Sequence, residues 1–111
     1  MSNSMTKVGI DDMAVYVPQL CLPIQSLAGA RALEYDKLNK GLGLTAMAMP
    51  DVHEDAATMA ANAVLELLEK NQVDPRKIGR LYVGTESGLD GSKPIASYVV
   101  GMLSQYFENQ Y

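Results

Sequence analysis

The chain is organised around the stretch GTESGLDGSK, residues 84–93, which follows the apolar run IGRLYV, residues 78–83. The run is rich in β-branched and aromatic residues and predicts an interior strand, and the glycines after it predict a turn. Pro94 then opens a segment with helical spacing. Strand, glycine-rich turn and helix in this order are typical of α/β folds, in which ligands bind at the carboxyl ends of strands. The sequence therefore predicts a ligand site in residues 84–93.

Glu86 is the candidate reactive group of this stretch. Hydroxyl residues flank it, and no lysine or arginine follows before Lys93. A carboxylate held in a dry pocket has a raised pKa and can act as both acid and base. The alternative interpretation is a solvated loop glutamate, and placement alone leaves both open.

The stretch resembles the signature loop of 3-hydroxy-3-methylglutaryl-CoA synthases of the bacterial and archaeal type. Other stretches fall in the same order and at similar spacing as in that family: GID at 9–11, YVP at 16–18, LA and AR within 27–31, and EDAATMAANA at 54–63. The resemblance covers nearly the whole chain from Lys7 on. It implies an α/β, thiolase-like fold, of which residues 7–111 form the N-terminal portion of the first thiolase half.

The resemblance also implies an acyl-CoA condensing enzyme. In that family a cysteine takes an acetyl group from acetyl-CoA, and the glutamate matched by Glu86 removes a methyl proton. The resulting enolate attacks acetoacetyl-CoA to give 3-hydroxy-3-methylglutaryl-CoA. The family's cysteine and histidine lie beyond the position matched by Tyr111, so Glu86 is the only catalytic residue that this chain could supply. Coenzyme A thioesters are the expected substrates, no cofactor or metal is expected, and the intact enzyme is expected to be a homodimer.

A second group of candidates lies earlier in the chain. By resemblance, the residues at the positions of Glu34 and Tyr35 approach the substrate, although relatives often carry Asp-Pro there. Arg31 is a candidate partner for a coenzyme A phosphate, because arginine and lysine bind phosphate well. The alternative for Arg31, Lys37 and Lys40 is a solvated helix face.

Two other functions remain open. Related synthases of polyketide β-branching accept an acetoacetyl group on an acyl carrier protein, and the discriminating residues lie mostly outside this chain. The other alternative is a non-catalytic chain that pairs with a subunit carrying the cysteine and histidine. An open reading frame past Tyr111, or the mass of the native protein, separates that alternative from the N-terminal portion of a larger enzyme.

The composition excludes several classes of protein. A chain of 111 residues with 48% hydrophobic content suits at most one domain. A net charge of −4 argues against nucleic-acid and anionic-membrane partners. No apolar run approaches the ~20 residues that span a bilayer. The single cysteine allows no intrachain disulfide and the first residues lack a signal-peptide pattern, so we expect a cytoplasmic protein.

The first half of the chain predicts a strand and two helices. Residues 1–6 are polar and are expected to be disordered. Residues 7–17 alternate as a strand does, with a slip of phase at Asp11-Asp12 that indicates a bulge. The apolar neighbours of Cys21 indicate a packing role for it. Helices are expected over residues 24–33 and 35–40, the second closed by Gly41.

The second half predicts two amphipathic helices. Asp51 and Glu54 have the spacing of a capping box, and an alanine-rich stripe predicts a buried helix over residues 56–68. His53 is interpreted as a capping or solvated residue, because neighbouring residues at a helix start do not converge on a metal ion. A polar turn over residues 71–77 precedes the strand, and Ser92 is expected to cap the last helix.

Overall fold

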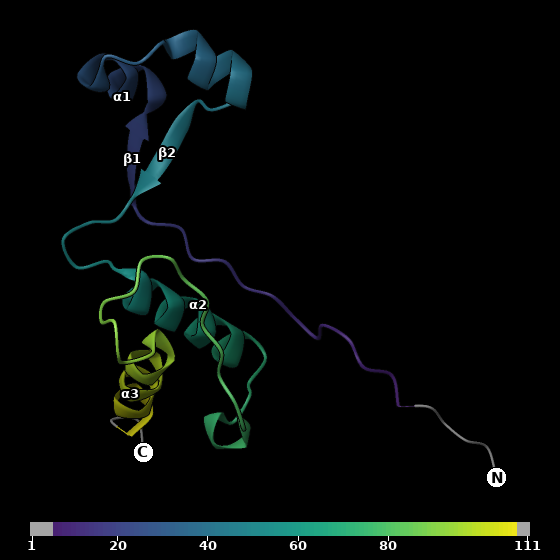
Figure 1. Ribbon diagram of the computed structural model, residues 1–111. Coiled ribbons are helices and arrows are strands. Elements are labelled where there is room, and N and C mark those ends of the chain that lie inside the picture. Colours follow the sequence, from purple (N-terminus) through teal and green to yellow (C-terminus); the bar gives the residue numbers. More distant parts are fainter. Residues whose placement is uncertain (1–5, 109–111) are drawn as a thin grey trace.

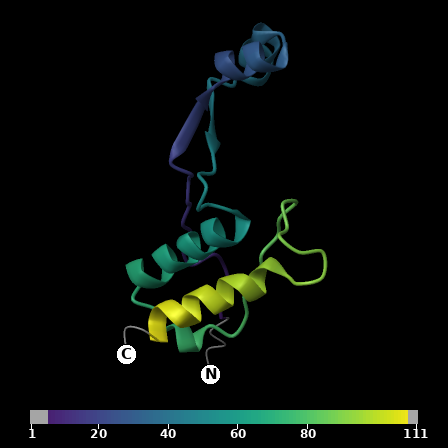
Figure 2. The same cartoon turned by 90° about the vertical axis from the view of Figure 1, so that its left-hand side faces the viewer.

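A computed structural model describes residues 6–108 of the chain. The element order is β1 (Leu20–Pro23), α1 (Ile24–Arg31), η1 (Lys37–Gly41), β2 (Ala46–Met49), α2 (Ala56–Lys70), η2 (Pro75–Lys77) and α3 (Ile95–Glu108). Figures 1 and 2 show two parts, which we name the arm (residues 20–49) and the body (residues 51–108). The radius of gyration is 19.2 Å, against about 13 Å for a compact chain of roughly this length. The molecule is therefore extended.

Two parallel helices make the body. In their first turns, Ala57 and Ala61 of α2 are buried together with Ile95 and Val99 of α3. Small alanine side chains let the two helices approach closely, so the predicted alanine-rich stripe does face a neighbouring element. The buried helix expected over residues 56–68 and the helix after Pro94 are both confirmed, and they pack on each other.

The start of α2 differs from the prediction. Asp55 caps the helix: its Oδ1 accepts from the Thr58 N–H at 2.8 Å, and the Thr58 hydroxyl accepts from the Asp55 N–H at 2.8 Å. Asp51 and Glu54 instead close a turn ahead of the helix. The predicted capping box was wrong because the sequence offers two pairs at the same spacing, Asp51 with Glu54 and Asp55 with Thr58. Spacing alone does not choose between them.

Residues 78–84 are extended, but they do not form the predicted interior strand. Leu81 and Val83 pack against the helix core while Tyr82 is 81% exposed, which is the alternation of a strand. Within residues 6–108, no backbone–backbone hydrogen bond joins residues 79–84 to another segment. The strand prediction was wrong because a strand needs a neighbouring strand, and the described chain places none there.

The strand predicted over residues 7–17 is also absent for the same reason, and with it the bulge. Val8 and Val15 are largely exposed. Side-chain contacts still align this segment with α2: Asp12 bonds Lys70 and Asn71 near the end of the helix. Farther along, Tyr16 bonds Glu54 just before the helix begins. For residues 1–5, the prediction of disorder lies outside the described residues.

The arm is a two-stranded antiparallel ribbon that carries α1 and η1. β1 pairs with β2 from Leu20↔Met49 to Pro23↔Ala46. α1 confirms the helix expected over residues 24–33, and it ends at Ala32, which has a left-handed φ of 50°. The second predicted helix is η1, which runs through Gly41. The left-handed glycine that follows is Gly43, at φ 70°, so the expected closure at Gly41 was wrong.

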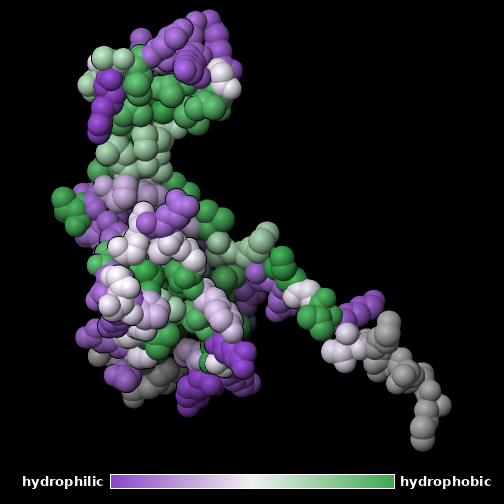
Figure 3. Space-filling model, in the orientation of Figure 1, coloured by the Kyte–Doolittle hydropathy of each residue, from purple (hydrophilic) through white to green (hydrophobic). Residues whose placement is uncertain are grey.

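Apolar side chains reach the surface of both parts (Figure 3). On the arm, Leu42 is 67% exposed, and Cys21 is exposed as well. The packing role expected for Cys21 was wrong, because none of residues 6–108 covers that part of the ribbon. Between residues 6 and 108, no helix combines the length and hydropathy needed to cross a membrane.

Candidate active site

The glycine-rich loop, residues 84–94, connects the extended segment to the N-terminus of α3. Figure 2 shows it projecting from the body beside the first turns of the helices. Two short turns order its ends: Thr85 Oγ1 accepts from the Ser87 N–H at 3.0 Å, and Asp90 Oδ1 accepts from the Ser92 N–H at 2.7 Å. The loop follows the carboxyl end of residues 78–84, and the ligand site predicted there stays a prediction.

Asp90 anchors the loop to the start of α3. Its carboxylate accepts from the backbone N–H groups of Ser92 and Lys93, and these bonds hold the pKa of Asp90 below its usual value. The Lys93 Nζ lies 3.9 Å from the centre of the Tyr98 ring, a cation–π contact. Ser92 is thus bonded within the loop, and the helix itself begins at Ile95.

Glu86 lies at the exposed part of this loop. Its carboxylate makes no hydrogen bond or ion pair with any residue between 6 and 108. The described residues do not form a dry pocket around it. What they provide is an accessible carboxylate on a loop whose two ends are held in place, and such a group can take a proton from a molecule that approaches it.

The earlier candidates lie in the arm. Arg31 is exposed in the last turn of α1, and Tyr35 is 38% exposed. Glu34 and Lys37 line a hollow of about 590 Å³, together with Ala32, Leu33, Leu38, Gly41 and Leu42. Lys40 instead forms an ion pair with Asp36, with 2.7 Å between Nζ and Oδ2. Of the three arm candidates, Glu34 therefore lines the hollow, whereas Arg31 and Tyr35 are exposed residues outside its lining.

The structure does not bring the arm candidates to Glu86. In Figures 1 and 2 the arm stands clear of the body, and the loop that carries Glu86 belongs to the body. Two separate groups of candidates result: a carboxylate on the body and a mixed acidic and basic group on the arm.

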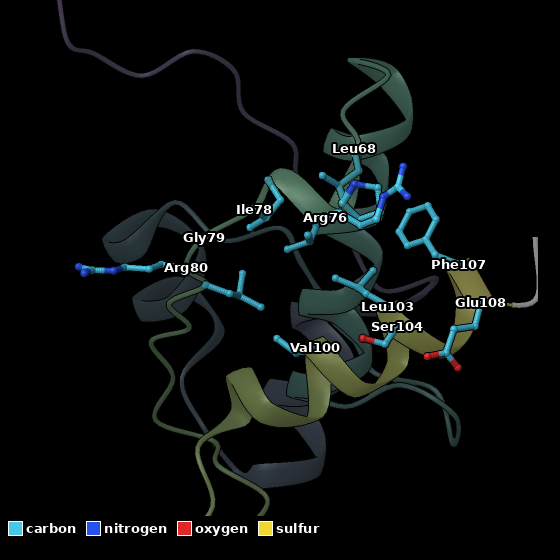
Figure 4. A pocket seen from close by; sticks show the side chains of 13 residues that line it. Leu68, Arg76, Ile78, Gly79, Arg80, Val100, Leu103, Ser104, Phe107 and Glu108 are labelled. Carbon is cyan, nitrogen blue, oxygen red and sulfur yellow. The ribbon is translucent and has the colours of Figure 1, made fainter. Parts of the chain in front are cut away.

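A second hollow of the described residues lies elsewhere. A groove of about 730 Å³ runs between α2, α3 and residues 75–81 (Figure 4). Leu68, Ile78, Leu103 and Phe107 contribute apolar side chains to it, with Glu108 at its end. It lies toward the C-terminal ends of the helices, away from Glu86. Its lining has the character of a packing surface, and sequence reasoning missed it because it depends on how the helices meet.

Metal-ligating side chains are dispersed. Within residues 6–108, no group of three or more His, Cys, Asp or Glu side chains could hold a metal ion. His53 is exposed in the turn before α2. Sequence reasoning also missed the hydrogen bond between the buried Glu54 and the partly buried Tyr16, because nothing in the spacing of these residues indicates that they meet.

Comparison with solved structures defines the class of protein. The chain superposes on MvaS in complex with 3-hydroxy-3-methylglutaryl coenzyme A with a TM-score of 0.77 and 46% identity, over 86% of this chain and 23% of that one. A crystal structure of HMG-CoA synthase complexed with CoA gives 0.68 and 31%, over 86% and 24%. The fold is therefore that of thiolase-like α/β enzymes, with the residues described here covering the N-terminal part.

The family follows from the sequence matches. Residues 4–110 match the family described as the N-terminal part of hydroxymethylglutaryl-coenzyme A synthase. The hydroxymethylglutaryl-CoA synthase of Haloferax volcanii is 40% identical over 108 residues, which are 96% of this chain and 24% of that protein. The chain belongs to the hydroxymethylglutaryl-CoA synthase family, and it spans about a quarter of the length of the curated relatives it matches.

Proposed function

We propose that this chain supplies the general acid/base, Glu86, of an enzyme that condenses acetyl-CoA with acetoacetyl-CoA to 3-hydroxy-3-methylglutaryl-CoA. The observation that carries the proposal is the loop of residues 84–94. It presents an accessible carboxylate at the carboxyl end of an extended segment, within the residues that match the family. The accessible side chain is free to meet a substrate.

The chemistry needs a nucleophile that this chain does not provide. A cysteine thiolate elsewhere in the complete protein attacks the acetyl-CoA carbonyl, and the coenzyme A thiolate leaves. Glu86 then takes a proton from the acetyl methyl group, and the enolate carbon bonds to the ketone carbon of acetoacetyl-CoA. The new alkoxide recovers a proton from Glu86. Water finally cleaves the thioester to the cysteine, which releases the product and restores the thiol.

The substrates proposed are coenzyme A thioesters. Both solved relatives carry coenzyme A or its 3-hydroxy-3-methylglutaryl thioester. We assign Arg31, which is exposed at the end of α1, to a phosphate of coenzyme A, because arginine binds phosphate well. We assign Glu34, which lines the hollow of the arm, and its exposed neighbour Tyr35 to the substrate. Acyl transfer, proton transfer and hydrolysis change no oxidation state overall, so the proposal includes no cofactor.

The rest of the complete protein has three tasks in this proposal. It supplies the cysteine, it supplies the histidine, and it covers Glu86 so that water is excluded during proton transfer. We further propose a cytoplasmic location, in keeping with the single cysteine of these 111 residues. The complete enzyme is proposed to be a homodimer.

A product assay tests the proposal. The complete purified protein is incubated with acetyl-CoA and acetoacetyl-CoA, and 3-hydroxy-3-methylglutaryl-CoA is measured by mass spectrometry. A parallel reaction offers acetoacetyl-acyl carrier protein. We expect product with the coenzyme A substrate. Product only with the carrier protein would favour the β-branching alternative, and a native mass that reveals a second type of subunit would favour the paired-chain alternative.

A further inference from the structure

Glu54 is the buried charged side chain of the described residues, with only 7% of its surface exposed. It lies at the junction between the arm and the body, just before α2 begins. Burying a carboxylate is costly unless hydrogen bonds compensate for the lost water. The partners of Glu54 therefore indicate its role.

Those partners come from both segments that connect the arm to the body, which we call the two chain crossings: the segment before β1 and the segment after β2. One carboxylate oxygen accepts from the Tyr16 hydroxyl, in the segment that enters the arm. The other oxygen accepts at 2.8 Å from the Asp51 N–H, in the segment that leaves the arm. The Asp51 carbonyl in turn accepts from the Glu54 N–H at 2.9 Å. A single side chain thus ties the entry to the exit.

The charge of Glu54 suits this role. The Tyr16 hydroxyl, and after it the Asp51 N–H, hold the pKa of Glu54 below its usual value, with smaller contributions from neighbouring His53 and from the Gln19 backbone. Burial opposes them. The group stays ionised at neutral pH, and an ionised carboxylate can accept from both crossings at once.

The arm has its own packing. Its helix α1 packs on β1 and η1, whereas α2 packs on α3. Figures 1 and 2 show the arm meeting the body at the two chain crossings. Within residues 6–108, the contacts that can set the angle of the arm therefore lie at its base, near Glu54.

We propose that Glu54 is a positioning residue that fixes the arm on the body and so sets the distance between the arm hollow and Glu86. Its effect on catalysis rests on the proposed function, whereas its effect on the arm does not. Two separate measurements distinguish the effect on the arm from the effect on catalysis.

The first readout is the arm–body distance in the complete protein. Cys21 on β1 and a Gln105→Cys substitution on α3, both exposed, carry spin labels, with any other cysteine replaced. Pulsed electron paramagnetic resonance then gives the distribution of distances between the two spin labels. Glu54→Gln keeps the size of the side chain and removes its charge, and the distribution should broaden. Tyr16→Phe removes one hydroxyl and should broaden it too.

The matched control is Glu69→Gln. Glu69 also accepts from a tyrosine hydroxyl, that of Tyr106 at 2.7 Å, but this pair lies within the body. The control should keep the parent distribution. A distribution equal to the parent's in folded Tyr16→Phe or Glu54→Gln overturns the proposal, and Tyr16→Phe alone decides if Glu54→Gln does not fold.

The second readout is steady-state kinetics with native cysteines. Displacing the arm should raise KM for acetyl-CoA more than it lowers kcat, and kcat/KM should fall by up to roughly 10²-fold, the effect of ~1 Å misplacement. Unchanged kinetics beside a broadened distribution overturn the catalytic effect. An inactive parent enzyme contradicts the proposed function and leaves the distance test to decide the positioning role.

Discussion

The Glu69 carboxylate on α2 accepts a hydrogen bond of 2.7 Å from the Tyr106 hydroxyl on α3. At the opposite end of the same helices, Ala57 is buried against the first turns of α3. The two helices therefore run in the same direction, and residues 78–83 run against them. This brings the carboxyl end of the extended segment and both helix N-termini to one end of the body, which is the end that carries Glu86.

Val99 is the first test of this packing, because its side chain is completely buried between the helices. Val99→Ala in the complete protein should lower the free energy of unfolding by roughly 1–3 kcal/mol, from lost burial and the cavity left behind. Urea denaturation measures it. Asn62, an exposed residue of α2, gives the control: Asn62→Ala should change the free energy of unfolding by less than about 0.5 kcal/mol. Equal effects of the two changes would contradict the observed packing.

The helix cap makes a second prediction. Asp55→Ala removes the acceptor for the Thr58 N–H and should cost roughly 1 kcal/mol, within the range known for N-caps. Asp51→Ala lies outside the helix and should cost less. Denaturation midpoints of the two variants compare them directly. A larger loss for Asp51→Ala would restore the capping box that the sequence suggested.

Asp12 gives a prediction about pH. Hydrogen bonds from Lys70 first, and then from Asn71, lower the pKa of Asp12 to about 2. Because the folded pKa lies below the ordinary value of 3.8, this contact stabilises the protein above pH 3.8, and the stabilisation is lost as the pH falls toward 2. Carboxyl ¹³C NMR should show this titration. Lys70→Met should move it toward 3.8, whereas Lys40→Met should not.

The predictability of this fold differs between helices and strands. α2 and α3 were predictable because helical spacing of apolar residues is a local property of the sequence. Ala57 and Ala61 show this spacing in α2, and Ile95 and Val99 show it in α3. The strand predicted over residues 78–84 has the right alternation, but hydrogen-bonded pairing depends on a neighbour that the pattern does not contain. The ribbon of β1 and β2 was missed because Ala46–Met49 is apolar throughout and shows no alternation.

The site was predictable in part for a similar reason. The position of Glu86 after an apolar run and among glycines is a local feature, and the structure places it at the end of that segment. Its exposure is a tertiary property. So is the burial of Glu54, which depends on a tyrosine 38 residues earlier in the chain.

The isolated 111-residue chain should lack a cooperative thermal transition. Its exposed surface is 9096 Å², against about 6,000 Å² for a compact protein of this mass, and many large apolar side chains are exposed. Its stability margin is correspondingly small. Differential scanning calorimetry should show no sharp heat-absorption peak. A two-state melt from a monomeric sample would show that the chain buries enough surface by itself.

The central claim concerns Glu86, and Glu86→Gln in the complete enzyme tests it most directly. Cysteine acetylation needs a thiolate and not this carboxylate, so transfer of labelled acetyl groups from acetyl-CoA to the enzyme should survive. Condensation with acetoacetyl-CoA should fall by at least roughly 10²–10⁴-fold, the contribution of general acid–base catalysis. The exposed α2 variant Glu66→Gln should leave both steps unchanged. Near-normal condensation by a folded Glu86→Gln enzyme, or an equal loss of both steps, would contradict the account.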